Sequence, residues 1–292
     1  MKTIKAPTSN SMDGKIRSNH TIITAYFLVN KTKRHSDSNY IELMERLFSN
    51  SDPMIIYTSP EVAPLLAEIR GKPERTVVIP MNLSDTNLVK RYPRPAFWES
   101  VSKDGRGAGI NNGYDYNLYQ IWNSKVDFLK LGSDMNPFQS NFFAWMDAGF
   151  VRWDEYTNST IIQRIPPELP ETKLAIMNIT PIIHFKTHHQ MGGGTFGGYK
   201  PAVDLYHAKY YEKFHEYANS TDRYTHVSNE QLVLYETCRD NDGLCFTINP
   251  RKSNNNAISW GLQVPYFYML PFFNTREYEE MEEKNFVDKS RW

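Results

Sequence analysis

The sequence contains no run of about 18 consecutive apolar residues, so no segment is expected to cross a membrane as a helix. Its N-terminal stretch, MKTIKAPTSNSMDGK, lacks the apolar core of a secretory signal. Acidic and basic residues balance at 33 each, so the chain has no net charge to attract nucleic acid or an anionic membrane. These absences predict a cytoplasmic protein with no integral membrane segment and no nucleic-acid partner.

Cysteine is also scarce, with two residues in the whole chain. Cys238 and Cys245 flank the segment RDNDGL and could bridge a tight hairpin. Because the sequence has no secretory signal, and disulfides are rare in reducing compartments, we interpret both as reduced thiols.

The composition is typical of a globular protein, since 40% of the 292 residues are apolar, 23% are charged and 14% are aromatic. We find no internal repeat and no linker, which favours one domain. Residues 1–19 are polar and are expected to form an N-terminal arm. Residues 20–274 would form the domain, and residues 275–292 an acidic helical tail packed on it.

Strands and helices alternate in the first part of the chain. Runs of β-branched and aromatic residues predict buried strands at residues 21–29, 53–59 and 75–81. Helical spacing of apolar residues predicts helices between them, at residues 40–49 and 60–71. This order is that of a parallel α/β sheet.

The rest of the chain continues the mixture after a polar segment, residues 82–115, that proline and glycine interrupt. Apolar periodicity and caps predict one helix at residues 117–135 and further helices at 200–219 and 228–241. Apolar runs predict strands at residues 141–146, 173–179, 181–186 and 245–249.

Asp147 stands at the tip of an apolar run in the segment NFFAWMDAGF, residues 141–150. One interpretation is a turn, because Asp and Gly are turn residues. The other is a metal ligand, because open α/β sheets bind ligands at the carboxyl ends of their strands. A divalent cation that bridges two phosphates needs only one or two carboxylates, since phosphate oxygens and water complete its coordination.

Two other motifs carry weaker signals. The segment GGGTFG, residues 192–197, matches the dinucleotide pattern, but the next helix starts only near Pro201 and no acidic residue ends a following strand. We interpret it as a flexible loop that lets the backbone approach a substrate. The segment DND, residues 240–242, has no apolar strand to hold it and is interpreted as a solvated turn.

Four segments together resemble one known family. They are TIITAYFLV at residues 21–29, NPFQSNFFAWMDAG at 136–149 with Arg152 behind it, GGGTFGG at 192–198 and NEQLVL at 229–234. They resemble the HtrL/YibB family, which belongs with the nucleotide-sugar-dependent glycosyltransferases of the GT-A fold. The resemblance covers roughly residues 20–250, and it implies a single GT-A-like (Rossmann-like) α/β domain with a mostly parallel central sheet flanked by helices.

The resemblance also implies a donor site. Such enzymes hold Mn²⁺ or Mg²⁺ on the donor diphosphate through an Asp-x-Asp motif, and the segment WMD, residues 145–147, stands in its place. Asp147 would be the metal ligand, while Trp145 replaces the first Asp. The remaining donor-binding residues would be Trp145 itself, Thr24, Ala25, Tyr26 and Phe27 at the tip of the first strand, Arg152 near the phosphates, and Gly193 and Gly194 in the acceptor and donor-sugar pocket.

Glu230 opens the helix that follows the glycine segment, where inverting enzymes of this fold carry the catalytic base. The alternative is a first-turn Glu that only complements the helix dipole. His188 and His189 would give a further metal or phosphate contact, or simply lie in solvent.

The implied function is therefore a metal-dependent glycosyltransferase that moves a sugar from a nucleotide-sugar donor, a UDP-sugar, to a hydroxyl of a carbohydrate acceptor with inversion. The alternative is a catalytically inactive, carbohydrate-binding module. The oligomeric state stays open.

Overall fold

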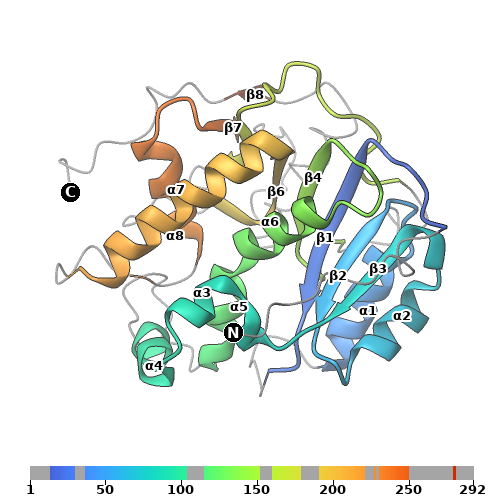
Figure 1. Cartoon of the computed structure of the whole chain (residues 1–292), viewed down its shortest axis with the longest axis horizontal. Coiled ribbons are helices and arrows are strands. Elements are labelled where there is room, and N and C mark those ends of the chain that lie inside the picture. The colour runs from blue at the N-terminus through green and yellow to red at the C-terminus, as the bar shows by residue number, and fades with distance from the viewer. Residues whose placement is uncertain are drawn as a thin grey trace, which may run out of the picture.

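The computed structural model describes residues 14–29, 37–103, 115–151, 160–178, 191–220, 227, 230–249 and 279–280. Within these residues one eight-stranded sheet has the order β3-β2-β1-β4-β6-β5-β7-β8 (Figure 1). Its strands are β1 (His20–Tyr26), β2 (Met54–Thr58), β3 (Thr76–Pro80), β4 (Phe142–Met146), β5 (Leu174–Asn178), β6 (Met191–Tyr199), β7 (Cys245–Asn249) and β8 (Glu279–Glu280).

The sheet is mostly parallel. β1 pairs in parallel with β2 and β4, β2 with β3, and β5 with β7. The antiparallel pairs are β6 with β4 and with β5, and β8 with β7. The expected α/β class, with a mostly parallel central sheet, is confirmed.

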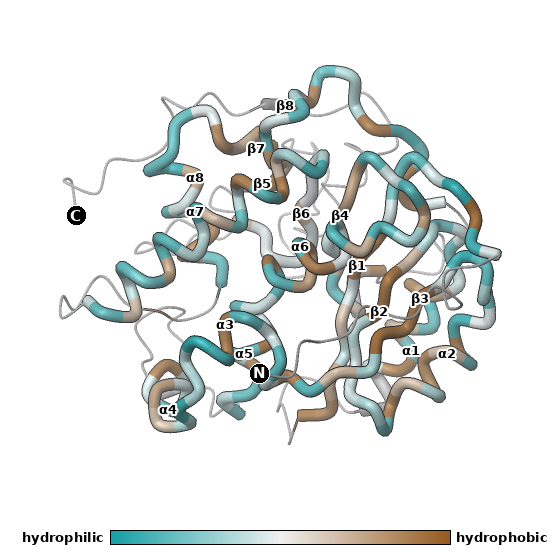
Figure 2. Tube along the Cα trace, viewed as in Figure 1, coloured by the Kyte–Doolittle hydropathy of each residue, from teal (hydrophilic) through white to brown (hydrophobic). Residues whose placement is uncertain are grey.

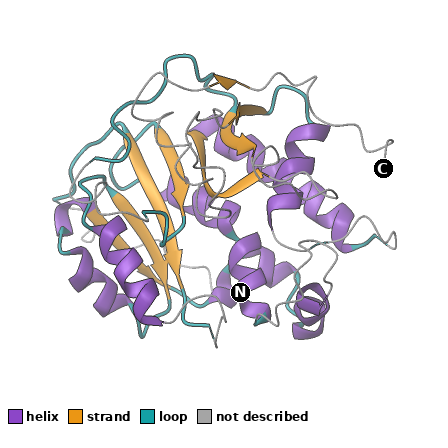
Figure 3. Ribbon diagram, turned by 180° about the vertical axis from the view of Figure 1, so that it is seen from behind, coloured by secondary structure: helices purple, strands orange, loops and turns teal. Residues whose placement is uncertain are grey.

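Helices cover both faces of this sheet. They are α1 (Asp37–Phe48), α2 (Ala63–Arg70), α3 (Asn87–Arg91), α4 (Pro95–Lys103), α5 (Tyr116–Asn123), α6 (Lys125–Met135), α7 (Lys200–Ala218) and α8 (Glu230–Asp240). α1 and α2 pack on one face, and α6, α7 and α8 on the other, as the front and back views show (Figures 1 and 3). No helix in the described ranges is both long and apolar enough to span a membrane.

Each face of the sheet belongs to its own hydrophobic core. Because side chains alternate along a strand, Ile22 of β1 joins the core under α1 and α2, whereas Ile23 joins the core under α6 to α8. A sheet covered on both sides needs apolar residues at every position. The run MIIYT of β2 is accordingly mostly brown in Figure 2, and apolar runs of this kind are why the sequence pattern located β1 to β4. The glycine-rich inner strand β6 is nearly white and carries no such run.

The expected single helix at residues 117–135 is wrong, because the chain breaks at Ser124 into α5 and α6. The Asn123 side chain donates to Tyr119 O (2.9 Å), and the Ser124 hydroxyl donates to Thr86 Oγ1 (3.2 Å). Short polar side chains of this kind compete with the helical backbone bonds. The break makes Lys125 the first residue of α6.

The glycine segment is also not the expected loop. It forms β6, between β4 and β5. At Gly197 a Cβ atom would lie 2.4 Å from Phe143 O and 2.8 Å from Ala144 Cα, so the absence of a side chain lets the strands approach. The polar segment after β3 likewise contains helices: Thr86 caps α3 by accepting from Val89 N, and Pro95 begins α4.

Two expectations near the C-terminus are corrected. Cys238 and Cys245 form a disulfide that ties α8 to β7, so the interpretation as reduced thiols is wrong. Glu279 and Glu280 lie in strand β8 rather than in a helix. The strand expected at residues 181–186, the cap at Ser228 and the rest of the tail lie outside the described residues.

Candidate functional site

The carboxyl ends of β1 and β4 meet where the direction of strand addition changes. From β1 the chain adds β2 and β3 on one side of the sheet, and it then returns to add β4 on the other side. Ile23 of β1 is level with Trp145 of β4, so Asp147 emerges directly beside the end of β1. In α/β sheets such a switch point is where ligands bind.

Asp147 is held there by four contacts, two through its side chain and two through its backbone. Its Oδ1 accepts a hydrogen bond from the indole Nε1 of Trp145 (2.8 Å) and lies 2.9 Å from the Nζ of Lys125. Its backbone N donates to Gly194 O (2.9 Å), and its carbonyl accepts from Phe150 N (2.8 Å) in a turn. The side chain is 28% exposed. Asp147 is therefore a turn residue whose carboxylate is also fixed in place and reaches solvent.

Lys125 links this carboxylate to a second one. Its Nζ donates to Glu230 Oε1 (2.6 Å) and to Gly193 O (2.9 Å), and only 4% of its side chain is exposed. The Nζ also lies 5.9 Å from the centre of the Trp145 ring. Lys125, Asp147 and Glu230 thus form a compact ionic cluster, which we call the Lys125 cluster, where α6, β4, β6 and α8 meet.

Glu230 begins α8, as the sequence predicted, and only 6% of its side chain is exposed. Burial raises the pKa of its carboxyl, the charge of Lys125 lowers it, and the charge of Asp147 raises it further; the net shift is upward. Burial alone would lower the pKa of Lys125, but its two carboxylate neighbours outweigh burial and raise it. The cluster therefore keeps the ammonium charged.

The sequence analysis missed Lys125. In the predicted helix it would stand four residues after Ile121 and four before Leu129, on the apolar stripe. A lysine at such a position is rarely buried unless it is paired. A lysine on the apolar stripe of a predicted helix is therefore a sequence signal for a buried ion pair.

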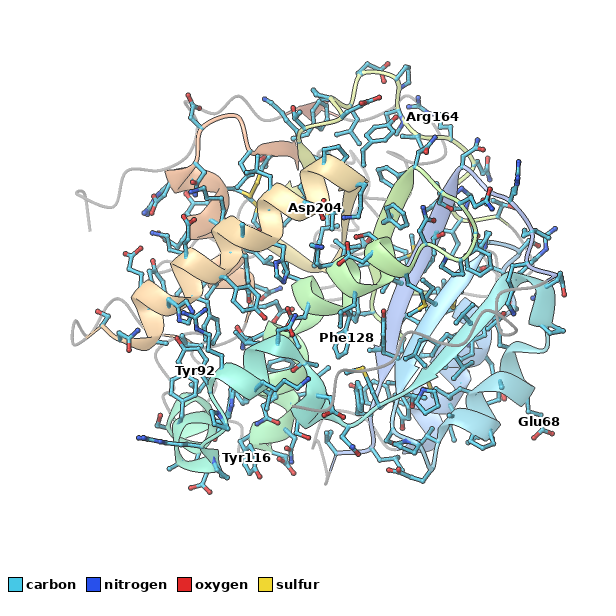
Figure 4. All side chains as sticks on the ribbon, viewed as in Figure 1. Glu68, Tyr92, Tyr116, Phe128, Arg164 and Asp204 are labelled. Carbon is cyan, nitrogen blue, oxygen red and sulfur yellow. A yellow bond between two sulfur atoms is a disulfide. The ribbon has the colours of Figure 1, made fainter. Side chains whose placement is uncertain are left out.

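Several predicted site residues gather around the Lys125 cluster. Trp145 is 1% exposed and contacts Asp147 through its N–H. The Trp145 ring stacks on Phe128 of α6 (5.9 Å between centroids), which stacks on Phe27 (5.7 Å); Phe128 is labelled in Figure 4. Gly193 and Gly194 lie in β6 and contact the cluster through their carbonyls.

The end of β1 is more deeply buried than a binding loop. Thr24 is 0% exposed, and Ala25 and Phe27 are buried, whereas Tyr26 is half-buried. The hydroxyl of Thr24 has no hydrogen-bond partner among the described residues. Phe27 lies just past the last residue of β1.

The other predicted residues are remote or undescribed. Arg152, His188 and His189 lie outside the described residues. Asp240 of the DND segment ends α8 and forms ion pairs with Lys213 (2.6 Å) and Arg239 (2.5 Å). In the described ranges no three His, Cys, Asp or Glu side chains gather as a metal site.

Comparison with known proteins supplies a family. Residues 18–193 match the family described as "Bacterial protein of unknown function (HtrL_YibB)". Protein HtrL of Escherichia coli (strain K12) is 28% identical over 184 residues, which are 56% of this chain and 62% of that protein. The match thus spans less than two thirds of the relative's length.

Among solved structures, the apo form of mouse xyloside xylosyltransferase 1 superposes with a TM-score of 0.37 and 10% sequence identity, over 75% of this chain and 80% of that one. The family match runs from just before β1 into β6 and covers more than half of the sequence. The chain therefore belongs to the HtrL_YibB family.

Proposed function

We propose that this protein is a glycosyltransferase that moves a sugar from a nucleotide-sugar donor, a UDP-sugar, to a hydroxyl of a carbohydrate acceptor with inversion. The observation that carries the proposal is the position of Asp147. Its carboxylate stands at the carboxyl end of β4, beside β1 at the switch point of the sheet, and shares the Lys125 cluster with Glu230.

The end of β1 supports a donor site. Thr24 and Thr58, on the neighbouring strands β1 and β2, both have buried hydroxyls without a hydrogen-bond partner among the described residues. Leaving a buried polar group unpaired costs about 1–3 kcal/mol. In this proposal the segment from Thr24 to Phe27 lines the nucleoside site, with the half-buried Tyr26 as its most accessible residue. Gly193 and Gly194 would face the sugar, and Arg152 would offset phosphate charge.

The chemistry of Asp147 fits a hard divalent cation. The contacts of its side chain with Trp145 and Lys125 both go to Oδ1, and the side chain is 28% exposed, which leaves Oδ2 as an oxygen ligand for Mn²⁺ or Mg²⁺. When bound, the ion would neutralise the charge that develops on the leaving nucleoside diphosphate. Trp145 and Lys125 would keep the carboxylate in one orientation.

Glu230 is the proposed base. It would accept the proton of the acceptor hydroxyl as that oxygen bonds to the anomeric carbon and the bond to the diphosphate breaks. A buried carboxylate with a raised pKa is a better proton acceptor than a solvated one. Its position in the same cluster as Asp147 supports this role.

A second candidate is the inactive carbohydrate-binding module. The contact that favours it is the ion pair of Glu230 with Lys125 at 2.6 Å, because a paired carboxylate that is 6% exposed is not open to an acceptor. In that case the cluster would only hold α6 and α8 together.

One experiment separates the two candidates. The protein is incubated with a panel of UDP- and GDP-sugars and Mn²⁺, and nucleotide release and donor binding are followed by NMR and calorimetry. A transferase releases nucleotide, and Glu230→Gln lowers turnover by about 10²–10⁴-fold. Donor binding without nucleotide release favours the inactive module. If the protein neither binds a donor nor releases nucleotide, the proposal is overturned. Retention in the anomeric proton coupling would remove Glu230 from the base role.

A further inference from the structure

We propose that Lys125 is a positioning residue of this site, whose ammonium holds the carboxylates of Asp147 and Glu230 in their working orientation. This inference rests on the proposed function, because it assigns Lys125 a role in the same site. Lys125 would act through the two acids and would not itself touch the substrate.

The hydrogen bonds of Lys125 support positioning over substrate binding. An ammonium has three N–H donors. Lys125 has three acceptors within reach: Gly193 O at 2.9 Å, Asp147 Oδ1 at 2.9 Å and Glu230 Oε1 at 2.6 Å. With 4% of the side chain exposed and every donor engaged, no donor remains for a ligand.

The charges of the cluster point the same way. The buried carboxylate of Glu230 and the partly exposed carboxylate of Asp147 repel each other when both are charged. One ammonium between them leaves a single net negative charge, from one positive and two negative groups. Because apolar residues often replace a buried ion pair at no loss of stability, stability alone is a weak reason to keep a lysine here.

The backbone is also shaped around this contact. A Cβ atom at position 193 would lie 2.1 Å from Glu230 Oε1 and 2.9 Å from its Cδ. Gly193 thus provides both a carbonyl acceptor for Lys125 and the space for the carboxylate that Lys125 binds. Two elements distant in sequence from Glu230, α6 through Lys125 and β6 through Gly193, therefore fix the position of one of its oxygen atoms.

The test compares Lys125→Met, which keeps the length and removes the charge, with Lys125→Arg, which keeps the charge. Lys130→Met is the matched control, because Lys130 lies on the same helix but pairs with Asp134 at the surface. We expect Lys125→Met to lower turnover roughly a hundredfold, the usual effect of misplacing a reacting group by about 1 Å. The donor KM should rise less, since Trp145 still holds Asp147. Lys125→Arg should recover part of the turnover, and Lys130→Met should leave it unchanged.

A double-mutant cycle and a crystal structure separate positioning from a merely structural role. If Lys125 acts through Glu230, Lys125→Met should lower turnover less than about threefold in a Glu230→Gln background. The Lys125→Met crystal structure should show the Glu230 carboxylate moved away from Gly193. The proposal would be overturned if the turnover losses of the two single variants multiplied in the double variant. It would also be overturned if the Glu230 carboxylate did not move in Lys125→Met. If Lys125→Met does not fold, Lys125→Gln replaces it in both measurements. If the wild-type protein releases no nucleotide, the proposed function fails, and the displacement of Glu230 alone decides the role of Lys125.

Discussion

The carboxylate of Glu230 lies so close to the backbone of Gly193 that a Cβ atom at position 193 would fall 2.1 Å from Glu230 Oε1. Two non-bonded heavy atoms cannot lie that close, so one of them would have to move. Glycine at position 193 is therefore needed for the Glu230 carboxylate to keep its present position beside Lys125.

Gly193→Ala should displace the Glu230 carboxylate and weaken the Lys125 cluster. Overpacking of this kind costs about 1–3 kcal/mol of unfolding free energy. The rate of nucleotide release should also fall, because the displaced carboxylate is the proposed base. Denaturant unfolding and the donor panel measure the two effects. Gly198→Ala is the control, because its Cβ would meet Ala202 Cβ at 3.1 Å and Lys173 O at 3.3 Å, contacts that need smaller adjustments. Equal effects at the two positions would contradict this assignment.

Asp147→Asn should weaken metal-dependent donor binding while the fold persists. The amide keeps the shape of the side chain and removes the charge that would hold a cation, so we expect a loss of roughly tenfold to a hundredfold, or about 1.5–3 kcal/mol. Calorimetry with UDP and Mn²⁺ measures it. Asp240→Asn serves as the control, since Asp240 is paired with Lys213 and Arg239 far along α8. If Mn²⁺-dependent binding is unchanged in Asp147→Asn, Asp147 is not the metal ligand.

Replacing Cys238 and Cys245 with Ser should destabilise the protein. The bridge closes a short loop between α8 and β7, with a sequence separation of 7 residues. For so short a loop the chain-entropy model gives about 2–3 kcal/mol. Denaturant unfolding measures this. Reductant should lower the unfolding free energy of the wild type by the same amount, and it should not change that of the double variant. Alkylation of both thiols in the native protein would contradict the disulfide.

Alkaline pH should unfold the protein through its buried tyrosines. Burial raises the pKa of Tyr206 and Tyr210 well above the ordinary value. Both stay neutral in the folded state while the unfolded chain ionises near pH 10, so their contribution to stability is complete below about pH 10 and is lost above it. The unfolding free energy should fall by about 1.4 kcal/mol per pH unit for each of them. The Tyr206→Phe and Tyr210→Phe double variant should show a shallower decline, and an identical pH dependence would contradict this account.

The sequence by itself determined the α/β class, the parallel β1 to β3 unit, the position of Asp147 at a strand tip and the start of α8 at Glu230. These features depend on local information. Hydrophobic runs, helical periodicity and turn residues act over a few neighbouring positions. A strand buried on both faces is recognised from its continuous apolar run.

Tertiary structure alone decided the Lys125 cluster, the strand β6 and the disulfide. Lys125 and Glu230 are 105 residues apart, and the sequence around each residue does not identify the other as its partner. The glycines of β6 are poor strand formers, and they form a strand because β4 and β5 offer hydrogen bonds on both sides and leave no room for side chains at Gly197. The cysteines meet because α8 returns to the start of β7. Such contacts follow from how distant segments pack, which periodicity along the chain does not encode.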